Sequence, residues 1–256
     1  MPDFATYPSL RGRKVFITGG ATGIGAAMVE AFSAQGARVG HLDLAVEAAE
    51  GLADQLADAG LEGPWFRRVD VTDAGALKGA IADFAEAAGG LDVLVNNVAN
   101  DTRHDPLAMT EEGWRACMAV NLDCAFFASQ RAVELMRAAG SGGAIINFSS
   151  INALLGPSEM PGYVTAKAGL LGLTKAFARH YGVDRIRANT ILPGWVVTQR
   201  QLDLWLTQEA EEAWMEQVCL KQRIEPVDAA NLALFLAADD SRMITNQHFV
   251  IDGGRV

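Results

Sequence analysis

Short, uninterrupted apolar runs alternate with longer Ala-rich stretches along this chain. The runs Val15-Phe16-Ile17 and Val93-Leu94-Val95 have no polar residue at alternate positions, which indicates strands buried on both faces. The predicted strands are Lys14–Thr18, Arg38–Leu42, Trp65–Val69, Leu91–Val95, Ala144–Ser149, Arg187–Ile191 and His248–Ile251. The predicted helices are Ile24–Gln35, Val46–Ala59, Ala74–Ala88, Glu111–Ala139, Tyr163–Tyr181 and Val227–Ala237. This alternation predicts an α/β fold with a doubly wound parallel sheet of about seven strands.

Composition limits the classes of partner. The net charge of −10 argues against nucleic acid or an anionic membrane as a partner. No apolar run is long enough to span a bilayer, and the start Met1-Pro2-Asp3-Phe4 has no basic region followed by an apolar one. We therefore expect a cytoplasmic protein. The three cysteines lack metal-ligand spacing and are predicted to be buried free thiols, so no metal is expected.

The 256 residues contain no repeat or linker, which predicts a single domain over residues 1–256. One segment departs from the βα alternation. More residues separate Ile191 from His248 than one helix needs, and Trp195, Trp205 and Trp214 stand there among acidic residues. Insertions at the carboxyl end of a strand often cover substrates in open α/β sheets. We therefore expect a substrate lid around residues 194–222; the alternative is a peripheral helical pair.

A glycine-rich turn follows the first predicted strand and precedes a helix. Its spacing is Gly19-x3-Gly23-x-Gly25. Glycines allow a tight turn and let backbone N–H groups approach a pyrophosphate at the helix N-terminus. The predicted dinucleotide contacts in this turn are Gly19, Thr22, Gly23, Ile24 and Gly25. The alternative is a turn that serves packing only.

Polar residues at the ends of the next strands extend this predicted site. Asp43 ends the second strand and is followed by Leu44 rather than a cation. A carboxylate here accepts ribose hydroxyl hydrogen bonds and repels a 2′-phosphate, so NAD is favoured over NADP; the alternative is a helix N-cap. Asp70-Val71 after the third strand is a candidate for the adenine, although Asp70 can equally cap the next helix. Asn97 after the fourth strand is a candidate to brace the nucleotide.

Tyr163 and Lys167 are four residues apart in a predicted helix and therefore share one face. A neighbouring ammonium favours the phenolate, so we expect a lowered Tyr163 pKa and a usable proton acceptor. Ser150, at a separate strand end, is placed to orient a substrate oxygen. A Tyr-x-x-x-Lys pair alone is weak evidence, because a solvated helix face has the same pattern.

Taken in order, these motifs resemble the short-chain dehydrogenase/reductase family over essentially the whole chain. The matching residues are Thr18-Gly19-x3-Gly23-Ile24-Gly25, Asp43, Asp70, Asn96-Asn97, Asn121, Ser150, Tyr163-x3-Lys167, Pro193-Gly194 and Asp252-Gly253-Gly254. The resemblance implies one Rossmann-like domain, a nicotinamide cofactor and a homotetramer. It implies that Tyr163 is the acid/base, that Lys167 holds the nicotinamide ribose, that Ser150 holds the substrate oxygen and that Asn121 supports a water in the proton path. It also implies cofactor contacts from Pro193, Gly194, Val196 and Thr198. Ala99 departs from the family pattern, which has glycine there.

The loop after the fourth strand points to the kind of substrate. Residues Asn100–Asp105 carry amide, carboxylate, guanidinium and imidazole groups, and each hydroxyl of a polyhydroxylated ligand needs such a partner once desolvated. The predicted substrate contacts are Asn100, Arg103, His104, Ser150, Asn152, Tyr163 and Trp195, the last by stacking on a sugar face. The alternative is a solvated loop with a surface histidine.

The stretches Asn100-Asp101-x-Arg103-His104 and Thr198-Gln199-Arg200-Gln201 resemble the xylose-type aldose 1-dehydrogenases of this family. The resemblance implies that NAD oxidises an aldose at C1 to a lactone. Two alternatives stay open: a short-chain dehydrogenase for another polar secondary alcohol or keto substrate, and a catalytically silent nucleotide-binding scaffold.

Overall fold

The structure is a computed structural model and describes residues 4–256. These residues form one seven-stranded sheet in the order β3-β2-β1-β4-β5-β6-β7, with every neighbouring pair parallel. The strands are β1 (Lys14–Thr18), β2 (Arg38–Asp43), β3 (Trp65–Arg68), β4 (Val93–Asn96), β5 (Gly143–Phe148), β6 (Ile186–Pro193) and β7 (His248–Ile251). The predicted Rossmann-like α/β fold is therefore confirmed. The first three residues, used above to judge a leader sequence, lie outside the described residues.

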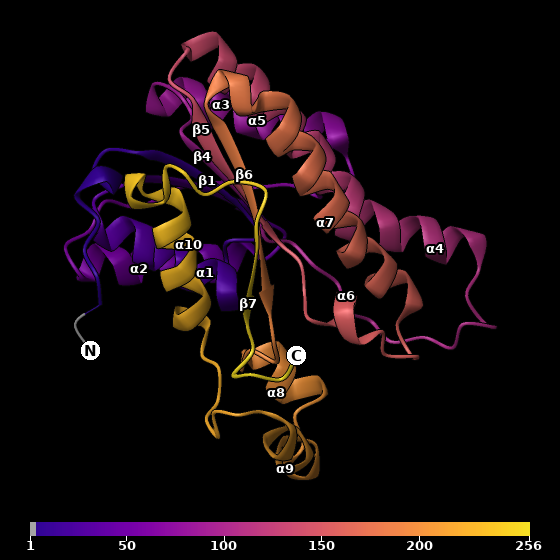
Figure 1. The fold of residues 1–256 in the computed structure, drawn as a ribbon. Helices are drawn as coiled ribbons and strands as arrows, with labels where there is room; N and C mark the ends of the chain where they lie inside the picture. The colour runs from indigo at the N-terminus through magenta and orange to yellow at the C-terminus, as the bar shows by residue number, and fades with distance from the viewer. Residues whose placement is uncertain (1–3) are drawn as a thin grey trace.

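Helices cover both faces of the sheet (Figure 1). One face packs on α1 (Gly23–Ala34), α2 (Val46–Asp58) and α10 (Pro226–Ala237), and the other on α3 (Ala74–Ala88), α5 (Cys124–Ala139) and α7 (Pro161–Tyr181). Side chains of β1 alternate between these layers: Val15 and Ile17 join the first core, whereas Phe16 joins the second. Burial on both faces explains why the strands are continuously apolar in the sequence.

The helix predicted over Glu111–Ala139 is not one regular helix. It comprises α4 (Glu111–Met118), a π-helical turn (Ala119–Asp123) and α5. The wider turn carries Asn121, whose buried amide bonds to the backbone of Asn100 in another loop. Such turns occur mostly as single insertions and often at functional sites. A helical hydrophobic pattern does not reveal the extra residue, so the prediction missed it.

The segment of residues 194–222 leaves the sheet after β6 and contains α8 (Gln199–Leu204) and α9 (Gln208–Gln217). Both helices lie beyond the carboxyl ends of the strands, near the C-terminus (Figure 1). A bridge between Val196 and Ile224 joins the two ends of the segment. A further short helix missed in the sequence, α6 (Asn152–Leu155), precedes α7.

The cysteines differ from one another in exposure. Cys124 is buried, Cys117 is half-buried and Cys219 is exposed on the 194–222 segment. The prediction of a buried thiol is therefore confirmed for Cys124, holds only in part for Cys117 and was wrong for Cys219, whose segment lies outside the main helical layers. Among residues 4–256 no group of three or more His, Cys, Asp or Glu side chains is placed to hold a metal ion. Over the same residues, no helix has the length and apolar character needed to cross a membrane.

Candidate active site

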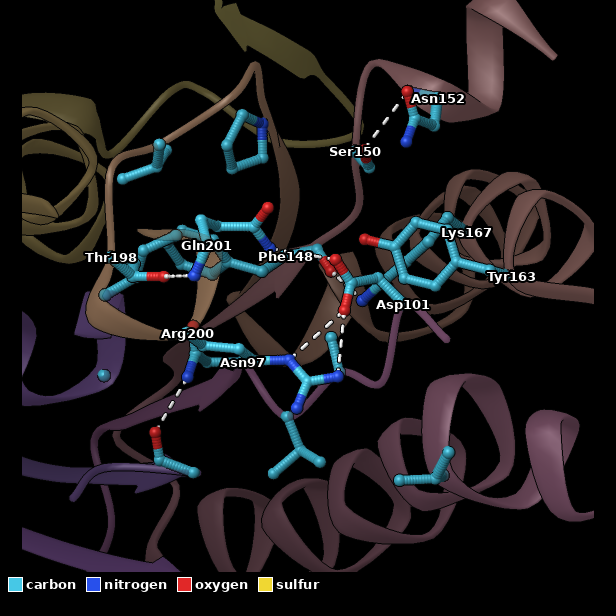
Figure 2. Close-up of a pocket in the computed structure, with 18 of the residues that line it drawn as sticks. Asn97, Asp101, Phe148, Ser150, Asn152, Tyr163, Lys167, Thr198, Arg200 and Gln201 are labelled. Carbon is cyan, nitrogen blue, oxygen red and sulfur yellow. Dashed lines mark hydrogen bonds and ion pairs between the residues drawn. The ribbon is translucent and has the colours of Figure 1, made fainter. Parts of the chain in front are cut away.

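A cleft of about 550 Å³ runs across the carboxyl ends of the strands. One end is formed by the glycine-rich turn and the tips of β2 and β3. The other end is formed by the loop after β4, the start of α7 and the 194–222 segment (Figure 2). The predicted site residues that line it are Gly19, Thr22, Ile24, Gly25, Asp43, Asp70, Val71, Asn97, Arg103, Ser150, Asn152, Tyr163, Lys167, Pro193, Gly194, Trp195, Val196 and Thr198. Gly23, Asn100, His104 and Asn121 do not line it.

The glycine-rich turn owes its shape to missing side chains. Gly19 and Gly23 have φ angles of +70° and +56°, in the region that favours glycine. A Cβ on Gly25 would lie 1.8 Å from the carbonyl oxygen of Gly19, so only a hydrogen atom fits there. Thr22 is the N-cap residue of α1 and its side chain accepts no hydrogen bond from the helix. The first N–H groups of α1 are therefore left for an anion such as a pyrophosphate.

Asp43 joins the glycine-rich turn to the end of β2. Its Oδ2 accepts a hydrogen bond from the backbone N–H of Ala21 at 3.0 Å, and its Oδ1 accepts from Leu44 at 2.7 Å and Ala45 at 3.1 Å. The N-cap residue of α2 is Ala45 rather than Asp43. A carboxylate has about four acceptor positions, so Asp43 keeps one acceptor position for a ribose hydroxyl.

Asp70 and Asn97 flank the same end of the cleft. The Oδ1 of Asp70 accepts hydrogen bonds from the backbone and hydroxyl of Thr72, which lower the pKa of Asp70. Asp73 is the N-cap residue of the following helix, so Asp70 does not have the alternative role of a cap. The Nδ2 of Asn97 donates to the carbonyl of Gly19 at 2.9 Å and thereby braces the glycine-rich turn. These residues, with the cradle around Gly25, fit a dinucleotide.

Tyr163, Lys167 and Ser150 meet in the middle of the cleft. Tyr163 and Lys167 are buried on one face of α7, with the Lys167 ammonium 5.7 Å from the centroid of the Tyr163 ring. Lys167 donates from Nζ to the carbonyl oxygen of Phe148 at 2.8 Å. Ser150 follows β5, and its hydroxyl accepts a hydrogen bond from the backbone N–H of Asn152. The neighbouring Ser149 instead donates to the Lys167 carbonyl, which agrees with the choice of Ser150.

The protonation of the pair differs from the expectation. Burial raises the pKa of Tyr163 above its ordinary value, and a hydrogen bond with Ser150 offsets only part of this rise. Burial also lowers the pKa of Lys167 to about 8. The prediction that Lys167 lowers the Tyr163 pKa was therefore wrong for the chain by itself. Removal from water disfavours the charged form of both groups, and the nearby Asp101 raises the pKa of Tyr163 further.

Asn121 holds the loop after β4 in place through its side-chain amide. Its Oδ1 accepts from the backbone N–H of Asn100 at 2.8 Å, and its Nδ2 donates to the carbonyls of Asn100 at 3.1 Å and Cys117 at 3.0 Å. The side chain is fully engaged with backbone groups. Its predicted role in a water-mediated proton path stays a prediction.

The polar loop after β4 presents only part of its side chains to the cleft. Arg103 lines the cleft and lies over the Trp205 ring, 4.3 Å from its centroid. The Oδ1 of Asn100 accepts hydrogen bonds from Thr102 within the loop. His104 is tied by its backbone N–H to the Glu159 carbonyl. Asn100 and His104 therefore stabilise the loop and do not line the cleft. The sequence did not reveal this, because side-chain directions in an irregular segment follow no fixed alternation.

Sequence reasoning missed a connected set of side chains at this end. The Nε2 of Gln201 donates to Oδ2 of Asp101 at 2.9 Å, and its Oε1 accepts from the Trp195 indole at 2.8 Å. Arg200 forms an ion pair with Asp101 at 3.2 Å, and the ring of Trp195 packs edge-on against Trp214. All five line the cleft. Their residue types were visible in the sequence, but their pairing across a hundred positions was not.

Comparisons with known proteins agree with this geometry. A family model described as enoyl-(acyl carrier protein) reductase matches residues 19–255. A protein named probable galactose dehydrogenase from Rhizobium meliloti is 45% identical over 248 residues, covering 97% of this chain and 96% of that protein. A D-xylose 1-dehydrogenase from Caulobacter vibrioides is 42% identical over 250 residues, with 98% of each covered. A solved short-chain dehydrogenase/reductase from Serratia marcescens superimposes with a TM-score of 0.89 at 31% identity, covering 96% of this chain and 99% of that one.

The chain therefore belongs to the short-chain dehydrogenase/reductase family, and it is an oxidoreductase of that class. The resemblance found in the sequence is confirmed. Within the family, the two relatives described above are named as dehydrogenases of sugars, in line with the sugar-type resemblance of the Asn100–Asp105 loop.

Proposed function

We propose that this protein is an NAD-dependent aldose 1-dehydrogenase that oxidises the anomeric carbon of an aldopyranose to a lactone. One observation carries the proposal: Tyr163 and Ser150 face a wall of polar side chains and tryptophans instead of an apolar tunnel. Carboxylate, amide and guanidinium groups in the wall match a ligand that carries a hydroxyl on nearly every carbon. The names of the galactose and xylose relatives support the same substrate class.

NAD is proposed as the cofactor because Asp43 stands where an adenosine ribose would lie. Its carboxylate already accepts from three backbone N–H groups, so it is held in place. With one acceptor position free, this negative charge would accept a hydrogen bond from a ribose hydroxyl and repel a 2′-phosphate. Gly19, Thr22, Gly23, Ile24 and Gly25 would hold the pyrophosphate, with Asp70, Val71, Asn97, Pro193, Gly194, Val196 and Thr198 completing the nucleotide site.

The proposed chemistry separates a proton from a hydride. Bound NAD would supply the hydride acceptor, a nicotinamide ring that carries a positive charge. Tyr163 takes the proton of the anomeric hydroxyl as the C1–H bond breaks and C1=O forms. A phenolate is required for this step, so the raised pKa of Tyr163 has to be offset by cationic groups around it. Ser150 holds the same oxygen by a hydrogen bond and keeps it in line with the phenol.

Lys167 is proposed to hold the nicotinamide ribose. One of its three N–H donors is used by the Phe148 carbonyl, and two are left for ribose hydroxyls. Asn121 is proposed to complete a proton path through water. In this scheme the substrate contacts are Ser150, Asn152, Tyr163, Arg103 and Trp195, with Asn100 and His104 acting on the loop that carries Arg103.

The 194–222 segment is proposed to act as a lid over the sugar. It supplies Trp195 and Gln201 to the cleft, and Arg200 ties it to Asp101 on the opposite loop. Closing this segment would exclude water from the reacting carbon.

We further propose a cytoplasmic homotetramer. Phe126 on α5 is 39% exposed and packs edge-on against the buried Phe177 of α7, which leaves an exposed aromatic side chain on a long helix. Association through this side chain would bury it. Sedimentation equilibrium of the purified protein tests the tetramer, and a monomer at micromolar concentration would contradict it.

The test of the function is a substrate screen that follows NADH formation, with aldoses, alditols, other polar alcohols and hydroxy acids, each run with NAD and with NADP. Turnover of aldopyranoses with NAD, and lactone as the product, is expected. Activity confined to non-sugar alcohols would replace the proposal with the broader dehydrogenase alternative. Nucleotide binding without turnover of any substrate would favour the silent scaffold.

A further inference from the structure

The loop after β4 and helix α8 meet at one carboxylate, that of Asp101. Its Oδ2 accepts from Gln201 at 2.9 Å, and its Oδ1 accepts from Nε and Nη2 of Arg200 at 3.3 and 3.2 Å. The side chain is 23% exposed and lines the cleft. Figure 2 shows it between Arg200 and the Tyr163 phenol. Asp101 is therefore a fixed anion at the place where a substrate must lie to reach Tyr163.

The carboxylate has unused bonding capacity. Two oxygens provide about four acceptor positions; Arg200 uses both positions of Oδ1 and Gln201 uses one of Oδ2, which leaves one position on Oδ2. A ligand buried against Asp101 therefore has to supply hydrogen-bond donors, because an unsatisfied buried acceptor destabilises the complex. Hydroxyl groups on adjacent ring carbons are such donors.

The surroundings of Asp101 also favour a sugar ring. Gln201 accepts from the Trp195 indole with the same amide that donates to Asp101. The orientation of the Trp195 ring is thus coupled to the position of the carboxylate. An aromatic face beside an acceptor of hydroxyl hydrogen bonds suits a ring with apolar C–H faces and polar edges.

We propose that Asp101 is a substrate-binding residue that determines specificity, by accepting a hydrogen bond from a ring hydroxyl near the carbon whose hydroxyl Tyr163 deprotonates. This inference rests on the proposed aldose oxidation and adds to it the residue that distinguishes sugars from other alcohols. Glu159, the other carboxylate at this end of the cleft, does not share this role, because it is exposed and its carboxylate accepts a hydrogen bond only from Ser158.

The test combines Asp101→Asn with deoxy sugars. The substitution keeps the shape of the side chain and removes its charge and one acceptor. Asp203→Asn is the matched control, since Asp203 lies on α8 with the Asp101 partners Arg200 and Gln201, hydrogen-bonds only to Gln199 and does not line the cleft. The values of kcat/KM are measured with saturating NAD on galactose and on its 2-deoxy, 3-deoxy, 4-deoxy and 6-deoxy analogues.

Asp101→Asn is expected to lower kcat/KM on galactose at least about tenfold, as for loss of a hydrogen bond to a charged group. The loss should shrink to less than about threefold on the ring-deoxy analogue that lacks the bonded hydroxyl, because the two changes remove one interaction. The 6-deoxy sugar should show the full loss, since a xylose relative acts on a sugar without that carbon. Asp203→Asn should match the unmodified protein.

Equal losses on every analogue would mean that Asp101 only holds the 194–222 segment, and would overturn the proposal; so would an unchanged kcat/KM on galactose. NADH binding, followed by tryptophan fluorescence, shows that each variant is folded. If Asp101→Asn does not bind NADH, Asp101→Glu is used, which keeps the charge and is expected to change the order of preference among the analogues. An unmodified protein that binds NADH but oxidises no aldose would contradict the proposed function, and this inference with it. An unmodified protein that oxidises aldoses, with the Asp101→Asn results described above as contradictory, would overturn the inference alone.

Discussion

The two ends of the cleft are built in different ways. The nucleotide end consists of a backbone turn, Gly19 to Gly25, between two consecutive elements, and its geometry depends on the absence of side chains. The substrate end consists of side chains from two distant segments, joined where Gln201 contacts Asp101 across 100 positions of sequence. Consecutive elements specify the glycine-rich turn itself, whereas the substrate end exists only after the whole sheet has formed.

This difference suggests what each end can tolerate. The close contacts of the glycine-rich turn leave no space for larger side chains. Substitutions in the turn are therefore expected to weaken binding of the nucleotide instead of changing which ligand binds. The substrate end is held by exposed ion pairs and single hydrogen bonds, which contribute little each. Substitutions there are expected to change which substrate binds while leaving the fold intact.

Removing the phenol oxygen of Tyr163 tests whether the two ends act independently. Tyr163→Phe is expected to lower kcat on any aldose that the protein oxidises by about 10³-fold, within the range for loss of a general acid/base. The Kd for NADH should stay within about twofold. Steady-state kinetics and a fluorescence titration measure the two quantities. Full turnover by the variant would contradict the proposed proton transfer, and lost NADH binding would show that the ends are coupled.

A methyl group in the turn tests how rigid the nucleotide end is. Gly25→Ala would place a Cβ 1.8 Å from the Gly19 carbonyl, and the backbone has to move to relieve this contact. The Kd for NADH is expected to rise at least about 100-fold, because the pyrophosphate cradle depends on that geometry. Gly51→Ala on α2 is the control, since no atom lies within 4 Å of its added Cβ; it should be neutral or slightly stabilising. Similar Kd values for NADH in both variants would show that binding does not depend on the geometry of the glycine-rich turn.

A buried histidine at the nucleotide end is expected to make the free energy of unfolding depend on pH. His41 of β2 is fully buried against Gly20, and neither ring nitrogen has a hydrogen-bond partner. Burial lowers the pKa of His41 from 6.5 to about 4. In the unfolded chain His41 is protonated below about pH 6.5, whereas in the folded chain it is protonated only below about pH 4. The free energy of unfolding therefore decreases as the pH falls from about 6.5 to about 4.

His41→Phe is expected to remove about 3 kcal/mol of that acid destabilisation, equal to the pKa difference multiplied by the free energy of one pKa unit. Urea unfolding at several values between pH 7 and pH 4 measures it as the difference in slope between variant and unmodified protein. Exposed His180, replaced by Gln, is the control and should leave the slope unchanged. Equal slopes for all three proteins would show that His41 is protonated in the folded state.

The smallest effect is expected at the rim of the substrate end. Arg103 lines the cleft and lies over Trp205, whereas His104 beside it does not line the cleft. Arg103→Ala is expected to raise KM for the sugar about threefold, as for one lost cation–π contact near the surface. His104→Ala should raise it less. A larger effect of His104→Ala would mean that the loop changes conformation when sugar binds.

Much of the fold could be predicted from the sequence. The strand Lys14–Thr18 and the helix Ala74–Ala88 were predicted with the bounds that the structure has, because a buried strand and an Ala-rich helix leave clear local patterns. The π-helical turn at Asn121 was missed, since one inserted residue hardly changes a hydrophobic pattern. The 194–222 segment was located but its two helices were not bounded, because few of its residues are buried and little periodicity results.

The sequence by itself determined the doubly wound sheet, the glycine-rich turn and the shared face of Tyr163 and Lys167, since each depends on residues that are close along the chain. Only the tertiary structure decided the state of Tyr163 and the partners of Asp101. Burial raises the Tyr163 pKa through removal from water by the whole surrounding fold. Asp101 finds Gln201 and Arg200 because β4 and β6 lie two places apart in one sheet, with β5 between them, so the loops at their carboxyl ends are brought together.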